Sequence, residues 1–171
     1  MARTATDVAR IRLLLLDVDG VLTDGSIWIG ADGSEIKRFH VHDGAGIAAW
    51  RRAGNQTAIL SGRSSEAVEH RARELGIAPV IQGASSKIEP FEALIADLGV
   101  DRSEVCFVGD DLPDIPVLRE VGFAVAPANA RPEVKAAAHH VTETPGGHGA
   151  VREVTELLLA AKAEVGGATT P

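Results

Sequence analysis

Two aspartates, Asp17 and Asp19, stand at the end of an apolar run and are the residues of this chain best suited to chemistry. Four leucines at positions 13–16 precede them, and Gly20 follows them. Residues two apart on an extended strand point to the same side, so both carboxylates can face one site. Two close carboxylates repel each other unless a cation lies between them, and Mg²⁺ prefers oxygen ligands of this kind. The alternative interpretation is a helix cap or a solvated loop.

A second acidic group follows another apolar run and a glycine, and it consists of Asp110, Asp111 and Asp114. Pro113 is expected to open a helix at this point. The helix dipole also favours acids at a helix N-terminus, so capping competes with metal binding as an explanation. Three acids in five positions exceed what one cap needs, and we interpret Asp110 as a metal ligand. For Asp111 and Asp114, capping and support of a metal site both stay open.

Two shorter features carry residue types that bind anions. Ser61-Gly62-Arg63 follows an apolar run and precedes a helical pattern, so its backbone N–H groups and the guanidinium can bind phosphate or carboxylate oxygens. Lys87 lies at the start of a predicted helix, where the dipole disfavours a cation, and this conflict hints at function. Taken alone, the first feature is also a common strand-to-helix turn, and the second is also a plain surface lysine.

Alternating strands and helices are expected to position these residues. Strands are predicted at residues 11–18, 56–60, 79–82, 105–108, 122–126 and 139–142. Helices are predicted at residues 44–53 and 149–162, and between the last two strands. Two more helices are predicted from their caps. One runs from a cap at Ser64 to Leu75, and the other runs from a capping box at Ser86 and Glu89 to near Gly99. This alternation predicts an α/β fold, a doubly wound Rossmann-like parallel sheet with helices on both faces. Ligands bind beyond the carboxyl ends of the strands in such sheets, and the polar motifs fall at those ends.

A protruding β-hairpin is predicted over residues 25–39, with its turn at Asp32-Gly33. Only this hairpin and a short helix separate the first acidic motif from Ser61, so no cap domain is expected over the site. A glycine-rich segment and a helix are predicted over about 145–162, and the tail from Gly166 is expected to fray. We therefore expect residues 1–171 to form a single domain.

The composition is that of a soluble globular protein, with 45% hydrophobic and 24% charged residues. The net charge of -7 argues against nucleic acid as the main partner. No apolar run approaches the roughly 20 residues of a membrane span, and residues 1–10 lack the apolar segment of a secretory signal. The one cysteine, Cys106, excludes an internal disulfide and fits the reducing cytoplasm, so we expect a cytoplasmic protein without a membrane partner.

The ordered motifs resemble those of the haloacid dehalogenase superfamily of phosphotransferases. They are DVDGVLTDG from Asp17, SGR from Ser61, a lysine at a helix start and GDDLPD at 109–114, and the resemblance covers residues 11–160. It implies that Asp17 attacks phosphorus to form an aspartyl-phosphate, and that Asp19 first donates and then accepts a proton.

The resemblance also implies a Mg²⁺ ion held by the Asp17 side chain, the Asp19 backbone carbonyl and Asp110. It implies that Ser61 and Lys87 bind the transferring phosphoryl oxygens. Asp111 and Asp114 would then orient Lys87 or the metal-bound waters.

A narrower resemblance is to the 3-deoxy-D-manno-octulosonate 8-phosphate phosphatases. It rests on the hairpin, on His42-Asp43-Gly44 read as a loop, on Arg71 downstream of SGR, and on residues 146–153. It implies a phosphorylated sugar acid as substrate, in lipopolysaccharide precursor synthesis. It further implies a homotetramer in which each hairpin and glycine-rich segment help to close a neighbour's site, with Trp28 at the interface.

The same resemblance assigns substrate recognition to Arg63 and Arg71, which lie eight residues apart and so about two helical turns. A solvated helix face is the alternative for Arg71. His42 and His148 stand where many members are expected to have arginine. His42 is therefore a substrate contact, a proton carrier or merely an exposed residue.

Three other hypotheses stay open at this point. The substrate can be a nine-carbon sialic-type acid 9-phosphate, although Arg63 favours the eight-carbon acid. A receiver-like phospho-acceptor domain is also acidic and doubly wound, but its phosphorylated aspartate follows a middle strand, where this chain has Ser-Gly-Arg. A catalytically idle domain is disfavoured by the intact Asp17, Asp19, Lys87 and Asp110.

Overall fold

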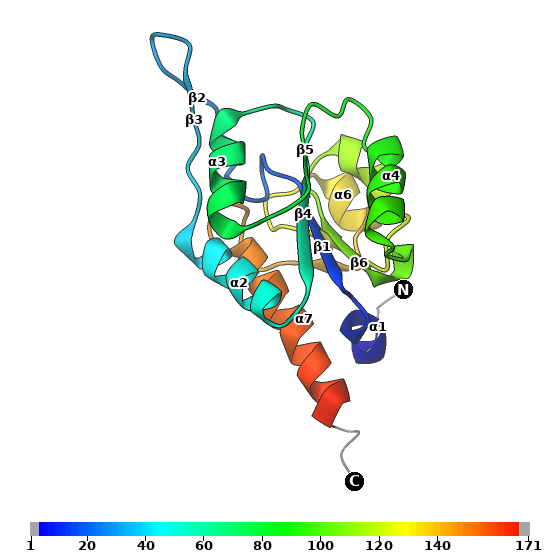
Figure 1. Ribbon diagram of the computed structural model, residues 1–171. Coiled ribbons are helices and arrows are strands. Elements are labelled where there is room, and N and C mark those ends of the chain that lie inside the picture. The colour runs from blue at the N-terminus through cyan, green and yellow to red at the C-terminus, as the bar shows by residue number, and fades with distance from the viewer. Residues whose placement is uncertain (1–3, 168–171) are drawn as a thin grey trace.

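The computed structural model describes residues 4–167, which contain a six-stranded parallel sheet with helices on both faces (Figure 1). The strands are β1 (Leu13–Leu16), β4 (Gln56–Leu60), β5 (Val80–Ile81), β6 (Val105–Val108), β7 (Phe123–Ala126) and β8 (His140–Val141). Their order across the sheet is β5-β4-β1-β6-β7-β8, and every pairing is parallel. The predicted doubly wound α/β fold is confirmed.

Helices cover both faces of the sheet, so both faces of its central strands are buried. One face carries α1 (Ala5–Ala9), α2 (Val41–Arg52), α3 (Glu66–Leu75) and α7 (Ala150–Gly167), and the other carries α4 (Ile88–Leu98), α5 (Ile115–Leu118) and α6 (Pro132–Ala137). Leu14 and Leu16 pack in the first core, and Leu13 and Leu15 pack in the second. The run of four leucines is thus a strand with two apolar faces.

The functional edge of the sheet lies at the carboxyl end of β1. Leu16 pairs with Ile59 of β4 on one side and with Val108 of β6 on the other. The chain winds away from β1 in both directions, so the strand order reverses there and leaves a crevice beyond the strand ends. Residues that directly follow β1, β4 and β6 therefore converge at one place.

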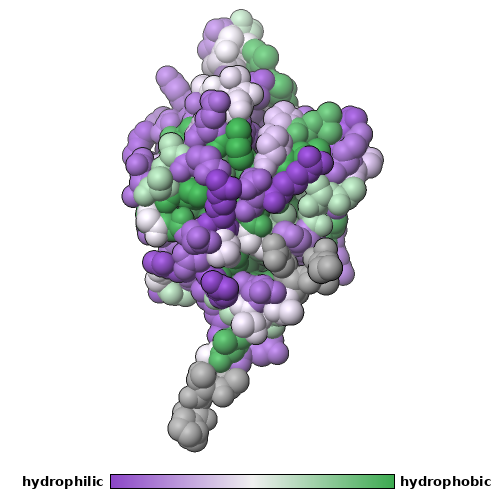
Figure 2. Space-filling model, turned by 90° about the vertical axis from the view of Figure 1, so that its right-hand side faces the viewer, coloured by the Kyte–Doolittle hydropathy of each residue, from purple (hydrophilic) through white to green (hydrophobic). Residues whose placement is uncertain are grey.

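The hairpin formed by β2 (Trp28–Ile29) and β3 (Glu35–Ile36) projects beyond this edge (Figure 1). Gly33 has φ of 84° in the turn, a backbone conformation that glycine adopts without strain. In the described chain, only this hairpin and α2 lie between β1 and β4. The hairpin side chains include an apolar group, visible at the top of the molecule in Figure 2.

Helix α2 begins three residues earlier than predicted. His42, Asp43 and Gly44 lie in its first turn and not in a loop. The cause is His40, whose side chain accepts a hydrogen bond from the backbone N–H of His42 and caps the helix. Trp50 on the same helix is fully buried, and its Nε1 donates to the carbonyl of Gln56 at 2.8 Å. Helix α2 therefore packs against the sheet through Trp50.

Two predicted helix caps are wrong. Ser65, not Ser64, precedes α3, and its side chain makes no capping hydrogen bond. The capping box of Ser86 and Glu89 is also absent from α4, because the residue before that helix is Lys87, whose backbone is already helical with φ -92° and ψ -18°. A capping residue needs an extended backbone to turn its side chain toward the helix N–H groups.

Helix α7 continues to Gly167, so the expectation that the chain frays at Gly166 is wrong for residues 166 and 167. The helix packs along α1, where Lys162 Nζ donates to the carbonyl of Ala9 at 3.0 Å. The rest of the predicted tail, 168–171, lies outside the described residues. Cys106 is fully buried, and burial raises the pKa of its thiol. Within residues 4–167, no helix has both the length and the apolarity needed to cross a membrane.

Candidate active site

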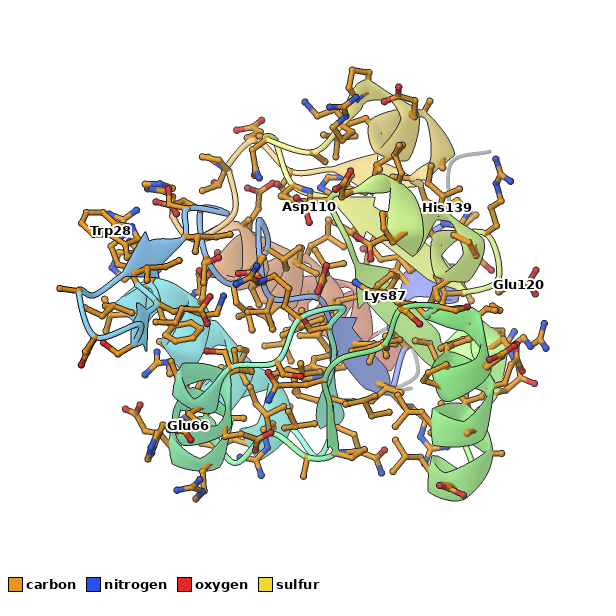
Figure 3. The ribbon with its side chains drawn as sticks, turned by 90° about the horizontal axis from the view of Figure 1, so that it is seen from above. Trp28, Glu66, Lys87, Asp110, Glu120 and His139 are labelled. Atoms are coloured by element: carbon orange, nitrogen blue, oxygen red, sulfur yellow. The ribbon has the colours of Figure 1, made fainter. Side chains whose placement is uncertain are left out.

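A cavity of about 260 Å³ opens at the carboxyl ends of β1, β4 and β6. It is lined by Asp17, Asp19, Gly25, Ser61, Gly62, Arg63, Lys87, Asp110, Asp111, Pro113 and Asp114. The structure thus brings together all four motifs singled out from the sequence. Seen from above, Lys87 and Asp110 lie near the middle of the molecule, whereas Trp28 lies at its margin on the hairpin (Figure 3).

Lys87 joins two acids at the centre of the cavity. Its Nζ lies 2.7 Å from Asp17 Oδ2 and 2.6 Å from Asp114 Oδ1, and all three residues are buried. Burial lowers the pKa of the ammonium, but the two carboxylates outweigh this effect and the pKa of Lys87 is raised. Lys87 is therefore a charged, fixed cation and not a surface lysine.

Asp17 is held through both of its oxygens. Oδ1 accepts a hydrogen bond of 2.7 Å from the backbone N–H of Val18, and Oδ2 contacts Lys87. Burial raises the pKa of Asp17 to about 6, because desolvation outweighs the attraction of Lys87. Above that pH, this carboxylate is a fixed anion at the end of β1, which suits it to nucleophilic attack.

The contacts of Asp114 and Asp111 indicate a different part for each of these acids. Asp114 Oδ2 accepts from the backbone N–H groups of Asp110 and Asp111 at 2.8 and 3.1 Å, while its Oδ1 contacts Lys87. Asp114 therefore fixes both Lys87 and the loop that carries Asp110. Asp111 caps the short 3₁₀ helix Leu112–Asp114 through a hydrogen bond from Leu112 N–H.

Asp110 is the acid that most needs a cation. One oxygen from each of Asp17, Asp110 and Asp114 can be chosen so that all three lie within 4.8 Å of one another. Asp110 Oδ1 is buried and, among the described residues, has no hydrogen-bond partner. Burial, and then the charges of Asp17 and Asp114, raise the pKa of Asp110 to about 8. An all-oxygen donor set with an unpartnered buried oxygen fits Mg²⁺.

Gly20 allows Asp110 to approach the loop after β1. Its φ is 82°, and a Cβ at this position would lie 2.0 Å from Asp110 Oδ2. Asn129 fixes the same loop, because its side-chain N–H donates to the Gly20 carbonyl at 2.9 Å while its Oδ1 accepts from Gly146 N–H at 2.6 Å. The glycine-rich segment thus packs against the chain's own first motif. Sequence reasoning missed Asn129, since an asparagine in a loop carries no distinguishing pattern.

Arg63 and Asp19 lie together at the mouth of the cavity. Arg63 Nε lies 3.5 Å from Asp19 Oδ2, and Arg63 Nη2 donates to Glu35 Oε1 at 2.7 Å. Ser61 is buried, and its backbone is fixed by hydrogen bonds with Ile81 and Ala84. Sequence reasoning missed Glu35 and the neighbouring Lys37, which also contacts Asp19.

The structure does not place Arg71 in this cavity. Arg71 lines a neighbouring hollow of about 550 Å³ together with Lys37, Phe39, Val41, Ala67, His70 and Glu74. Its Nη1 lies 2.8 Å from Glu74 Oε2. The expected helical spacing to Arg63 does not apply, because α3 begins only at Glu66.

Four further residues singled out from the sequence do not line the cavity. Asp43 is buried and accepts a hydrogen bond of 2.9 Å from Arg152 N–H in the first turn of α7, and burial raises the pKa of its carboxyl. A Cβ at Gly44 would lie 2.5 Å from Arg71 Nη2, so this glycine makes room for that guanidinium. His42 is exposed, and His148 Nε2 lies 3.2 Å from Arg38 Nη2.

A doubly wound sheet with an acid-lined cavity at the end of β1 defines the class of this protein. Residues 43–122 match the family model of haloacid dehalogenase-like hydrolases. The chain is 45% identical over 161 residues to 3-deoxy-D-manno-octulosonate 8-phosphate phosphatase of Yersinia pestis, covering 94% of this chain and 86% of the relative. The Salmonella typhi phosphatase of the same name is 46% identical over 160 residues, with 94% and 85% covered.

Solved structures agree with this class. The Yersinia pestis phosphatase superposes with a TM-score of 0.91 at 44% identity, covering 95% of this chain and 88% of that one. The Moraxella catarrhalis phosphatase, solved with a magnesium ion, a phosphate ion and a KDO molecule, gives 0.91 at 40% identity, with 95% and 94% covered. The chain belongs to the 3-deoxy-D-manno-octulosonate 8-phosphate phosphatase family of haloacid dehalogenase-like hydrolases.

Proposed function

We propose that this protein is a Mg²⁺-dependent phosphatase. It hydrolyses 3-deoxy-D-manno-octulosonate 8-phosphate to the free sugar acid and phosphate, in lipopolysaccharide precursor synthesis. The observation that carries the proposal is the Asp17–Lys87–Asp114 chain beside Asp110, in a chain 45% identical to a phosphatase of that name. Strand β4 ends at Leu60 and is followed by Ser61 and not by an acid, so the receiver-domain alternative lacks its phosphoacceptor.

Asp17 is the nucleophile in this proposal. Its carboxylate attacks phosphorus, a bond forms between an Asp17 oxygen and phosphorus, and the bond from phosphorus to the sugar oxygen breaks. The contacts from Val18 N–H and Lys87 hold the carboxylate in one orientation before the substrate arrives. Such preorganisation removes part of the entropic cost of attack.

Asp19 transfers the protons. It gives a proton to the departing sugar oxygen, which keeps the electron pair of the broken bond. In the second half of the reaction, Asp19 takes a proton from water as the water oxygen attacks phosphorus. The bond between Asp17 and phosphorus then breaks, which releases phosphate and restores both acids.

The remaining cavity residues balance charge. Lys87 and the Ser61 hydroxyl bind the phosphoryl oxygens, where negative charge is concentrated in the transition state. The Asp17 and Asp110 side chains and the Asp19 backbone carbonyl hold Mg²⁺, and Asp114 keeps Lys87 and the Asp110 loop in place. When bound, Mg²⁺ supplies positive charge that offsets the charge of the phosphate oxygens.

Arg63 recognises the carboxylate of the sugar acid. Its guanidinium is half exposed at the mouth of the cavity, and it already pairs with carboxylates of this chain. A guanidinium suits bidentate binding of a carboxylate. Arg71, in the neighbouring hollow, is a second candidate for contact with the sugar.

The assembly in this proposal is a homotetramer in the cytoplasm. The cavity of about 260 Å³ lies just below the usual size of a ligand pocket, and Arg63 at its mouth is half exposed. A neighbouring copy that covers this mouth would exclude water from the reaction. The single, buried cysteine supports the reducing compartment.

A comparison of substrates tests the proposal. We expect kcat/KM for 3-deoxy-D-manno-octulosonate 8-phosphate to exceed that for a nine-carbon sialic-type acid 9-phosphate by at least about tenfold, because a fixed pocket discriminates substrates by their fit in the transition state. EDTA should abolish turnover of both. If neither acid is hydrolysed faster than p-nitrophenyl phosphate, the assignment to a sugar-acid phosphate is wrong.

A further inference from the structure

Lys37 lies at the base of the hairpin and has no part in the proposed catalytic steps. It directly follows β3, yet its side chain is only 1% exposed. Its Nζ forms an ion pair with Asp19 Oδ1 and lies 3.5 Å from Glu35 Oε1. Removing an ammonium from water costs several kcal/mol unless carboxylates compensate, so this burial is not that of a solvated hairpin lysine.

Asp19 is held from two sides by cations of unequal exposure. Lys37 contacts Oδ1 from the hairpin, and Arg63 Nε lies 3.5 Å from Oδ2 at the end of β4. Glu35 Oε1 links the two cations, at 2.7 Å from Arg63 Nη2 and 3.5 Å from Lys37 Nζ. The Arg63 side chain is 49% exposed, so its contact with Asp19 constrains little, whereas the buried Lys37 constrains much.

We infer that Lys37 is a positioning residue for proton transfer by Asp19. The inference rests on the proposed function, in which Asp19 protonates the departing sugar oxygen. Lys37 fixes Oδ1, which leaves Oδ2, with its longer and more exposed contact, for the proton transfer. The base of the hairpin thereby sets the orientation of the acid that completes each half of the reaction.

The leaving group separates this role from a merely structural one. A sugar alkoxide must take the Asp19 proton as the phosphorus–oxygen bond breaks, because the alkoxide is a strong base. A p-nitrophenolate is stable as an anion and leaves without a proton. A misplaced Asp19 therefore slows formation of the aspartyl-phosphate from the sugar phosphate but not from p-nitrophenyl phosphate.

The test compares Lys37→Met, Lys37→Arg and, as control, Lys162→Met, which removes a partly buried lysine far from the cavity. For Lys37→Met, we expect kcat on the 8-phosphate to fall roughly 10- to 100-fold, with KM changed less than about threefold. The pre-steady-state burst of p-nitrophenolate should stay within about threefold of wild type. Lys37→Arg, which keeps a cation, should recover part of kcat, and Lys162→Met should match wild type.

A double-mutant cycle shows whether Lys37 acts through Asp19. In an Asp19→Asn background, Lys37→Met should cause no further loss of the p-nitrophenolate burst or of 8-phosphate turnover. Circular dichroism melts report whether each variant folds, and Lys37→Gln replaces the methionine variant if that one does not. The inference is overturned if the p-nitrophenolate burst falls as much as kcat on the 8-phosphate, or if the loss is additive in the Asp19→Asn background. If wild type hydrolyses simple alkyl phosphates but not the 8-phosphate, the proposed substrate fails, and the same comparison on the alkyl phosphate still tests Lys37.

Discussion

Three acids, the buried Asp17 and Asp114 and the half-buried Asp110, lie around Lys87, and one ammonium does not neutralise them. Both oxygens of Asp114 have partners, because Oδ1 accepts from Lys87 and Oδ2 accepts from backbone N–H groups. Asp17 and Asp110 are left with excess negative charge in a desolvated place, which is why burial raises their pKa values to about 6 and about 8. The site is therefore electrostatically incomplete without a divalent cation.

The raised pKa of Asp110 predicts how the metal-free protein responds to pH. The folded protein keeps the Asp110 proton up to about pH 8, whereas the unfolded chain loses it near its ordinary pKa of 3.8. The folded state binds more protons between these values, so its stability falls as pH rises toward 8. We expect the Tm of the EDTA-treated protein to fall between pH 6 and pH 9, and Mg²⁺ to raise the Tm more at pH 9.

Asp110→Asn is the control for this prediction, because it removes the titrating carboxyl. The variant should lose most of the pH slope and most of the stabilisation by Mg²⁺. Asp17, with a pKa of about 6, titrates mainly below pH 7, so the slope between pH 7 and pH 9 reports on Asp110. An unchanged slope in Asp110→Asn would show that another group titrates.

At the residue level, sequence reasoning succeeded where a polar residue directly follows an apolar strand. Asp17, Ser61 and Asp110 meet because parallel strands end at one edge. It could not place Asp43, whose carboxylate binds Arg152 N–H, a partner 109 residues away. Lys37 carried no signal either, since its burial depends on how the hairpin folds back onto Asp19.

Among the elements, the turn after β1 is the one whose geometry the site depends on. Gly20→Ala should displace Asp110, because its Cβ would lie 2.0 Å from Oδ2. We expect Mg²⁺ affinity, measured by calorimetry, to fall roughly 10- to 100-fold, as for other disturbances around metal ligands. The left-handed φ of 82° adds a stability cost of about 1–2 kcal/mol.

Gly54→Ala is the matched control. Its φ is 85°, but a Cβ there meets no atom within 4 Å. It should show a similar loss of stability in chemical denaturation with unchanged Mg²⁺ affinity. Wild-type affinity in both variants would mean that the close approach to Gly20 does not place Asp110.

The order of elements was predictable because each apolar run and each amphipathic stretch has its own period. The residues at which these elements begin and end were harder to predict. The start of α2 depends on His40 as a cap, and the start of α4 depends on the helical backbone of Lys87. Such details follow from the dihedral angles of single residues, which the surrounding packing decides.

At the scale of the whole molecule, the hairpin stands out because its apolar side chains are exposed to solvent in the single chain. Trp28, Ile29 and Ile36 are 61%, 70% and 61% exposed on two strands of two residues each. An isolated short hairpin is marginal in water, and an apolar cluster of this kind marks an association surface. Sequence patterns within one chain carry no signal for the residues that a neighbouring copy contributes in the proposed tetramer.

Trp28→Asp should therefore dissociate the proposed homotetramer. Light scattering coupled to size exclusion should give four chains for wild type and fewer for the variant, because a buried unpaired charge at an interface is costly. Val141→Asp, which charges an exposed apolar residue on the edge strand β8, should remain tetrameric. A monomeric wild type would contradict the proposed assembly.

The central claim is that phosphate passes through Asp17 at the end of β1. The most direct measurement is to quench turnover of 3-deoxy-D-manno-octulosonate 8-phosphate with borohydride, which reduces an aspartyl-phosphate to homoserine, and to map the product by mass spectrometry. We predict homoserine at position 17, dependent on both substrate and Mg²⁺, and neither homoserine nor turnover in a folded Asp17→Asn variant. Continued turnover in that variant, or a phosphorylated residue elsewhere, would contradict the account.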